Sequence, residues 1–257
     1  MAAFEPVPEA LIKVAPRYPG DKEPDRQARR YLKQLNDMAK GHDRPYSWGL
    51  TVFRTTYTAE SDETFPRAIE RLKQHAHAFA TEDLRSKVKR LPGNSFTQFN
   101  PPEGPLDPAP NEELSRRFYC DIIEDAASLD GADAEEVGRA FDAWLDKHRQ
   151  LEDLRQVYWG RYHFCILMDE QGIDHLLQFD PSEPPRGHWR EKYDFYVKVV
   201  TVFRRGQTDM RRFWLRVGIK ENIFILANGV DDIDISEIGM PDPEDAAYNW
   251  YGLFPYW

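Results

Sequence analysis

Apolar residues in the first part of the chain recur with two different periods. From Pro24 to Lys40, and again from Ser61 to about Ala80, they return every three or four positions, as an amphipathic helix requires. Between these helices lies the stretch SWGLTVFRTTYT (Ser47–Thr58), which is rich in β-branched and aromatic residues and predicts a strand. A strand followed by a helix is the beginning of a β-α unit.

The middle of the chain predicts a loop and then two helices. Residues 91–110 contain six prolines and two glycines, which indicates a loop. One helix is expected over residues 112–129 and a second from about Ala134. The first of them would face inward with one residue per turn: Leu114, Phe118, Ile122 and Ala126. We therefore expect residues 111–157 to form a helical hairpin inserted between elements of a sheet.

The second half of the chain returns to β structure. Strands are expected over Tyr162–Asp169, Tyr193–Arg204 and Phe213–Ile219, and short helices over 173–179 and 221–228. The helices and strands together predict an α+β fold with an antiparallel or mixed sheet, roughly ferredoxin-like, and with its helices on one face.

The whole chain, residues 1–257, is expected to form a single α+β domain. Its flanks differ in composition: residues 1–20 hold four prolines and predict an extended arm, while residues 230–257 form a tail that is first acidic and then aromatic. The aromatic part, YNWYGLFPYW, is too apolar to leave in water. We expect it to cap the core, or alternatively to dock into a partner such as a second copy of the chain.

Alternation of side chains in the three later strands separates an aliphatic face from a mixed one. If these strands are neighbours in register, the mixed face gathers a histidine, two aromatic and two cationic side chains: His163, Tyr196, Lys198, Trp214 and Arg216. The first predicted strand could add Arg54 or Tyr57.

Two interpretations of this mixed face stay open. Cations beside aromatic rings are typical of a site for a small anionic or aromatic molecule. There Lys198 and Arg216 would neutralise the anionic group, Trp214 and Tyr196 would stack on the ligand, and His163 would be the proton-transfer candidate. Alternatively the face is a solvated or helix-covered surface, on which lysine and arginine lay their stems against the rings.

Charge, hydrophobicity and cysteine content indicate which partners and which cellular location to expect. The net charge of −10 repels phosphate backbones, so we expect no nucleic-acid partner. No apolar run approaches the roughly 20 residues of a transmembrane helix, so we expect a soluble protein without a membrane partner. The first residues do not follow the pattern of a secretory signal, and the two cysteines, Cys120 and Cys165, are expected to be free thiols. These features predict a cytoplasmic location.

Short motifs of catalysis and cofactor binding do not occur in the sequence. His75 and His77 lie two positions apart on a predicted helix and cannot form the paired ligands of a zinc site, so no metal is expected. There is no GxGxxG, GxxxxGK[ST] or GxSxG motif, and no cofactor is expected. Whether the protein is an enzyme stays open. A module for protein–protein interaction, using the aromatic tail, is the alternative to ligand binding.

The segment WGLTVFRTTYTAESDETFPRAIERL, with the later FYVKVVTVF and FWLRVGI, resembles a group of uncharacterised proteins from filamentous fungi. The shared pattern is a strand ending in Arg54-Thr55, a Ser-Asp pair before a helix, and a later Val-Lys-Val strand. The resemblance covers about half of the chain. It implies a cytosolic fungal α+β protein with no established activity, and no catalytic residue is carried over from it.

Overall fold

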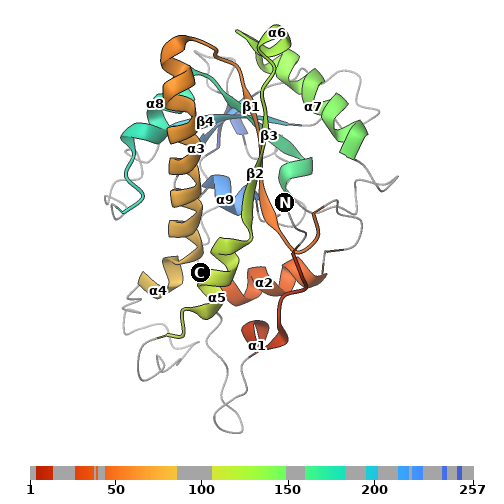
Figure 1. The fold of residues 1–257 in the computed structure, drawn as a ribbon, viewed down its shortest axis with the longest axis vertical. Helices are drawn as coiled ribbons and strands as arrows, with labels where there is room; N and C mark the ends of the chain where they lie inside the picture. Colours follow the sequence, from red (N-terminus) through yellow and green to blue (C-terminus); the bar gives the residue numbers. More distant parts are fainter. Residues whose placement is uncertain are drawn as a thin grey trace, which may run out of the picture.

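The computed structural model describes residues 4–13, 27–37, 39, 44–85, 106–148, 160–182, 195–201, 214–219, 222–227, 239–241 and 248–250. Within these ranges the chain forms a mixed α+β fold, in which a single sheet is flanked by helices (Figure 1). The fold class predicted from the sequence is therefore confirmed.

The sheet has the strand order β2-β1-β3-β4-β5-β7-β6. The strands are β1 Trp48–Arg54, β2 Phe118–Ile123, β3 Phe164–Met168, β4 Tyr196–Thr201, β5 Trp214–Gly218, β6 Gly239–Pro241 and β7 Tyr248–Trp250. Strand β1 pairs in parallel with both β2 and β3, whereas β4 is antiparallel to β3 and to β5. Strands β5 and β7 pair in parallel, and β6 and β7 pair antiparallel. The sheet is thus mixed.

Helices cover both faces of the sheet, whereas the sequence predicted one covered face. The described helices are α1 Glu9–Ile12, α2 Gln27–Asp37, α3 Ala59–Ala80, α4 Glu82–Arg85, α5 Ala109–Arg116, α6 Ala126–Leu129, α7 Ala134–His148, α8 Glu170–Gln178 and α9 Asn222–Ala227. Figure 1 shows α3 and α8 on one side of the sheet and α7 on the other. Among these helices none is long and apolar enough to cross a membrane.

Consecutive residues of β1 demonstrate the two faces. Phe53 packs against Phe141 of α7, with ring centroids 6.0 Å apart, while Arg54 donates to Ser61 of α3. Because neighbouring side chains of a strand point to opposite faces, α3 and α7 must lie on opposite sides of β1. All seven residues of β1 are buried, as expected for a strand between two layers.

Trp48 lies at the centre of the core and joins three elements. Its ring centroid is 4.7 Å from that of Phe118 on β2, 6.0 Å from Phe79 on α3 and 6.3 Å from Phe224 on α9. The indole nitrogen Nε1 donates to the carbonyl of Leu114 over 2.7 Å, so the buried polar atom is satisfied. One hydrophobic cluster therefore connects the sheet to helices from both ends of the chain.

The predicted helix over residues 112–129 is wrong, and so is the helical hairpin over 111–157. Helix α5 ends at Arg116, strand β2 follows, and α6 is a separate short helix. Phe118 and Ile122 are four residues apart, a spacing that places them on one face of a helix or of a strand. The backbone decides between the two, because the amide of Trp48 donates to the carbonyl of Arg117 and opens the pairing of β1 with β2. Helix α7, the second half of the predicted hairpin, is present.

The strand order also departs from the ferredoxin-like scheme. That scheme splits its β-α-β units, so that another strand lies between the two strands that a helix connects. Here α3 connects β1 to β2, which lie directly side by side. The β1-α3-β2 unit is thus an ordinary parallel crossover, and β4 adds antiparallel pairs with β3 and β5.

Candidate functional site

The three later strands lie side by side, as the sequence analysis required. Strand β4 is paired with β3 on one edge and with β5 on the other, and Lys198 is directly opposite both Leu167 and Arg216. Leu167 is in turn paired with Phe53, which contacts α7. Directly paired residues share a face of the sheet, so Lys198 and Arg216 lie on the α7 face.

Four predicted site residues converge on this face: Tyr196, Lys198, Trp214 and Arg216. We call them the β4–β5 cluster. The Lys198 ammonium nitrogen lies 5.0 Å from the centroid of the Trp214 ring. The Arg216 guanidinium carbon lies 5.1 Å from the Tyr196 ring centroid and 5.7 Å from that of Trp214. All four side chains are half-buried. These distances fall within the range of cation–π interactions.

Asp169 supplies a carboxylate to the cluster. Its Oδ2 accepts a hydrogen bond from Lys198 Nζ over 2.5 Å, and its Oδ1 accepts from the backbone amide of Gly172 over 2.9 Å. The second bond caps the first turn of α8, which fixes the carboxylate at the end of β3. Asp169 is not among the site residues predicted from the sequence, although an aspartate that directly follows a strand and precedes a helix is a typical N-cap.

His175 of α8 is a second neighbour that the sequence analysis did not assign. Its Nδ1 lies 2.9 Å from the carbonyl oxygen of Tyr196, and the two rings meet edge to face with centroids 4.7 Å apart. The contact joins residues 21 positions apart on a helix and a strand, so no periodic pattern indicates it. His175 holds the start of β4, where Tyr196 enters the cluster.

His163 does not lie within the cluster. It occupies the exposed turn before β3, at the opposite end of that strand from Asp169. Cys165 is paired with Val200, and Val200 with Trp214, so His163 lies two strands from Trp214 and two residues before Cys165. With the usual spacing of strands and residues, His163 and Trp214 are roughly 12 Å apart. The histidine expected to transfer protons is therefore remote from the cations.

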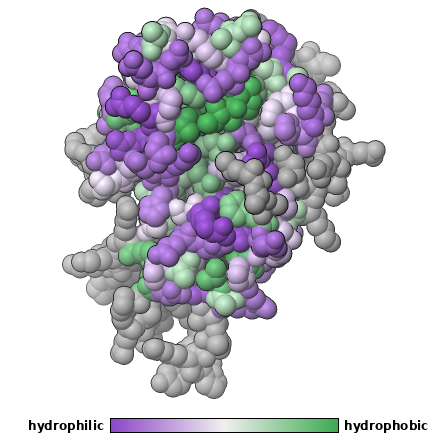
Figure 2. Space-filling model, in the orientation of Figure 1, coloured by the Kyte–Doolittle hydropathy of each residue, from purple (hydrophilic) through white to green (hydrophobic). Residues whose placement is uncertain are grey.

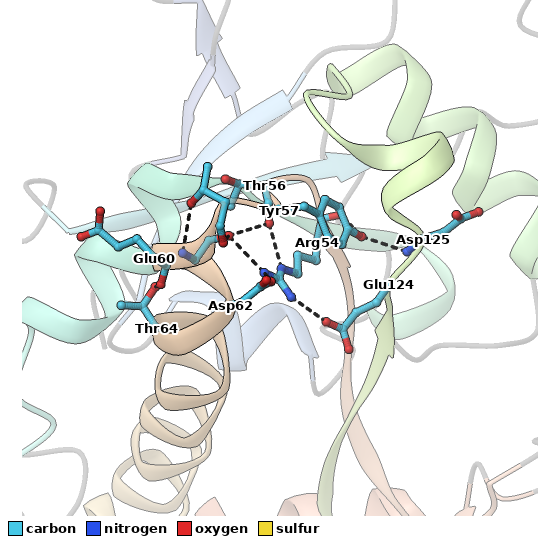
Figure 3. Close-up of polar contacts among 10 residues, drawn as sticks. Arg54, Thr56, Tyr57, Glu60, Asp62, Thr64, Glu124 and Asp125 are labelled. Carbon is cyan, nitrogen blue, oxygen red and sulfur yellow. Dashed lines mark hydrogen bonds and ion pairs between the residues drawn. The ribbon is translucent and has the colours of Figure 1, made fainter.

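Arg54 lies on the other face of the sheet, where it joins three elements (Figure 3). Arg54 is 6% exposed, and its Nε donates to the carbonyl of Thr56 over 2.8 Å. One terminal nitrogen donates to Glu124, which follows β2, over 3.0 Å. The other donates to Ser61 of α3 over 3.0 Å and also to Asp62.

Aromatic rings complete the surroundings of Arg54. Its guanidinium carbon lies 4.7 Å from the Tyr57 ring centroid and 4.9 Å from that of Phe65. Burial lowers the pKa of Arg54, but the hydrogen bonds to Glu124 and Asp62 outweigh burial and the net pKa is raised. Arg54 therefore stays charged and connects β1 with α3 and with the end of β2.

The Tyr57 hydroxyl extends these contacts toward α6. It donates to the carbonyl of Arg54 over 3.0 Å and accepts from the amide of Asp125 over 2.8 Å. Burial raises the pKa of Tyr57. Neither Arg54 nor Tyr57, both of which the sequence analysis offered as additions to the mixed face, belongs to the β4–β5 cluster.

A shallow groove of about 490 Å³ runs along α3 and is separate from the cluster. It lies between that helix and residues 180–182, and its charged lining residues are Glu70, Arg71, Lys73 and Asp180. Lys73 and Glu70 are 3.5 Å apart. Because the two acidic and two basic residues balance each other, this groove does not favour an anion.

The described residues contain no group of three or more histidine, cysteine or acidic side chains that could hold a metal ion. In comparisons with known proteins, no family model, no curated protein and no solved structure matches this chain. The resemblance to filamentous-fungal proteins therefore stays a prediction.

Proposed function

We propose that this protein binds a small molecule that carries both a negative charge and an aromatic ring, at the β4–β5 cluster. The observation that carries the proposal is the direct cross-strand pairing of Lys198 with Arg216. Like charges at this spacing destabilise a sheet unless opposite charges offset them. An anion held between Lys198 and Arg216 is attracted by both cations, in addition to the ion pair that Lys198 forms with Asp169.

The neighbouring cations support an anionic ligand. Lys198 and Arg216 lie directly opposite each other on β4 and β5, and Lys198 also forms an ion pair with Asp169. The side chains of Lys198 and Asp169 are 21% and 25% exposed. Partial removal from water strengthens the attraction of the Lys198 ammonium group for a ligand anion relative to a fully solvated surface.

The two rings support an aromatic component. Trp214 and Tyr196 present π systems beside the cations, and a ligand ring can stack against either of them. Stacking also fixes the orientation of the ligand, which a pair of flexible cations does not. Because His163 lies at the other end of β3, we limit the proposal to binding and assign no catalytic step.

The alternative function, a protein–protein interaction module that uses the aromatic tail, has less support. The backbone of Tyr248–Trp250 forms β7 and pairs with β5 of the same sheet. The other tail residues apart from β6, namely 230–238, 242–247 and 251–257, lie outside the described residues. The free thiols of Cys120 and Cys165 fit the cytoplasmic location that we infer for the protein.

Thermal unfolding in the presence of matched probes tests the proposal. Phenylacetate and phenyl phosphate carry ring and charge together; acetate and inorganic phosphate carry charge alone; 2-phenylethanol carries the ring alone. A ligand at 100 times its Kd adds about 2.7 kcal/mol to the free energy of unfolding. For a chain of this size that corresponds to a rise in Tm of about 5–10 °C. We expect the aromatic anions to raise the Tm most.

Two double variants provide the control. The Lys198→Ala, Arg216→Ala protein should lose the response to the aromatic anions. The Lys33→Ala, Arg139→Ala protein removes the same charge from exposed helical ion pairs, and it should respond like the wild type. The proposal is wrong if neither aromatic anion stabilises the wild type more than its single-feature probes, or if both double variants respond equally.

A further inference from the structure

Strand β2 forms one edge of the sheet. Within the described residues it pairs with β1 alone, and its outer edge faces away from the sheet. An edge strand offers unpaired amides and carbonyls to another strand. Proteins usually protect such an edge with lysine, proline or a bulge.

The sequence of β2, FYCDII, contains none of the usual protective residues. Its one charged residue, Asp121, is 2.6 Å from Arg161 and 3.2 Å from Arg44, so its charge is already paired. Ile122 is 41% exposed, which is more than any other large apolar residue among the described residues. Figure 2 shows an apolar area facing the viewer in the region where Figure 1 places β2.

The two ends of β2 carry opposite charge. At the amino end, Glu113 pairs with both Arg116 and Arg117, which leaves a net charge of +1. At the carboxyl end, Arg54 pairs with both Asp62 and Glu124, which leaves a net charge of −1. Two copies of β2 in antiparallel orientation bring each positive end beside a negative end.

The side chains of β2 are also complementary to themselves. In an antiparallel pair related by a two-fold axis through Cys120, Phe118 lies opposite Ile122 of the second copy. Residues of equal parity share a face, so this register keeps the α3 faces of both copies on the same side. Glu124 directly follows β2 and Arg116 ends the helix that precedes it, so the same register brings the Glu124 end of one copy toward the Arg116 end of the second copy.

We propose that this protein forms a symmetric dimer in which β2 pairs antiparallel with β2 of a second copy, and the two sheets become one continuous sheet. We choose a second copy as the partner because an antiparallel copy of β2 places opposite charges beside each other at both ends, and places apolar Phe118 beside apolar Ile122. Strands β1 and β3 separate β2 from β4, so the dimer leaves the β4–β5 cluster uncovered. This interaction is independent of the proposed ligand.

Sedimentation equilibrium of the full chain at several concentrations tests the dimer. The wild type should show a reversible monomer–dimer equilibrium. Ile122→Lys places a cation in the edge of both copies and removes two apolar contacts, so the dimer Kd should rise about 100-fold. Because Ile122 is 41% exposed, the variant should keep a Tm close to that of the wild type. The control Gln171→Lys adds the same charge on an exposed position of α8 and should dimerise normally.

Charge reversal tests the antiparallel register. Arg116→Glu and Glu124→Arg should each raise the dimer Kd about tenfold, since each creates two like-charge contacts per dimer. The variant that carries both reversals should recover the Kd of the wild type. A chain that stays monomeric at all concentrations, an Ile122→Lys protein that dimerises like the wild type, or a double reversal without recovery would each overturn the proposal.

Discussion

Replacement of Arg54 by methionine should lower the free energy of unfolding by about 4 kcal/mol, although both ionic partners of this arginine are exposed. The side chains of Asp62 and Glu124 are 63% and 49% exposed, and ion pairs of this kind contribute about 0.5–1 kcal/mol each. The hydrogen bonds to Ser61 and to the Thr56 carbonyl contribute more, about 1.5 kcal/mol each, because they join a charged donor to shielded acceptors. Methionine fills most of the apolar space and leaves only a small cavity.

Variants of the partners separate these contributions. Glu124→Gln and Asp62→Asn should each cost about 0.5–1 kcal/mol, and 1 M salt should remove most of that cost. Arg54→Lys keeps the charge but has no planar fork, so it cannot reach Thr56, Ser61 and Glu124 together. The lysine variant should therefore lose most of the stability that the methionine variant loses.

Urea unfolding, followed by the fluorescence of the seven tryptophans, provides the measurement. Arg139→Met serves as the control, because Arg139 forms an exposed pair with Glu135 and should cost less than about 0.5 kcal/mol. The reasoning is refuted if Arg54→Met costs no more than Glu124→Gln. Since Arg54 lies on the α3 face, its variants should also keep the response to aromatic anions.

Two further predictions concern β1 and β2. An added Cβ at Gly49 would lie 1.9 Å from the carbonyl oxygen of Tyr119, so Gly49→Ala must push β1 and β2 apart. The variant should lower the free energy of unfolding by about 3 kcal/mol or more in the same urea assay. A loss below about 1 kcal/mol would contradict this close approach. Burial raises the pKa of the Cys120 thiol to about 12, so iodoacetamide at pH 8 should alkylate it at least about 100-fold more slowly than in the unfolded chain. Because this pKa is higher in the folded state, the stability linked to the protonated thiol is lost as the pH rises from about 8.5 toward 12. Equal alkylation rates in the folded and unfolded chain would show that Cys120 is not shielded.

The β4–β5 cluster could be predicted from the sequence because aliphatic side chains alternate with polar or aromatic ones over Tyr196–Val199 and Trp214–Val217. Val197 and Val199 face one side and Lys198 the other, and the antiparallel pairing with β5 repeats the pattern at Arg216. A period of two fixes the faces without knowledge of the rest of the fold. The adjacency of β3, β4 and β5 was the remaining assumption, and it is confirmed.

Other parts of the site depend on contacts that no local pattern records. Asp169 and His175 reach the cluster from α8, across a turn and a helix–strand contact. Arg54 was placed on the wrong face because its strand is buried on both sides, so alternation of polar and apolar residues is weak there. The strand β2 was mistaken for a helix because the spacing of Phe118 and Ile122 fits both structures.

The position of β1 between β2 and β3 has a consequence during synthesis of the chain. Its residue Val52 is paired with Ile122, 70 positions later, and with Ile166, 114 positions later. The first edge of β1 can be completed when Ile123 has been made, but the second must wait for Met168, 45 residues further on. At a synthesis rate of about 5–20 residues per second, that wait lasts about 2–9 seconds. During those seconds the edge of β1 that later pairs with β3 is exposed, although β1 is fully buried in the finished fold. A chaperone that binds unpaired strands would act on the chain in this interval.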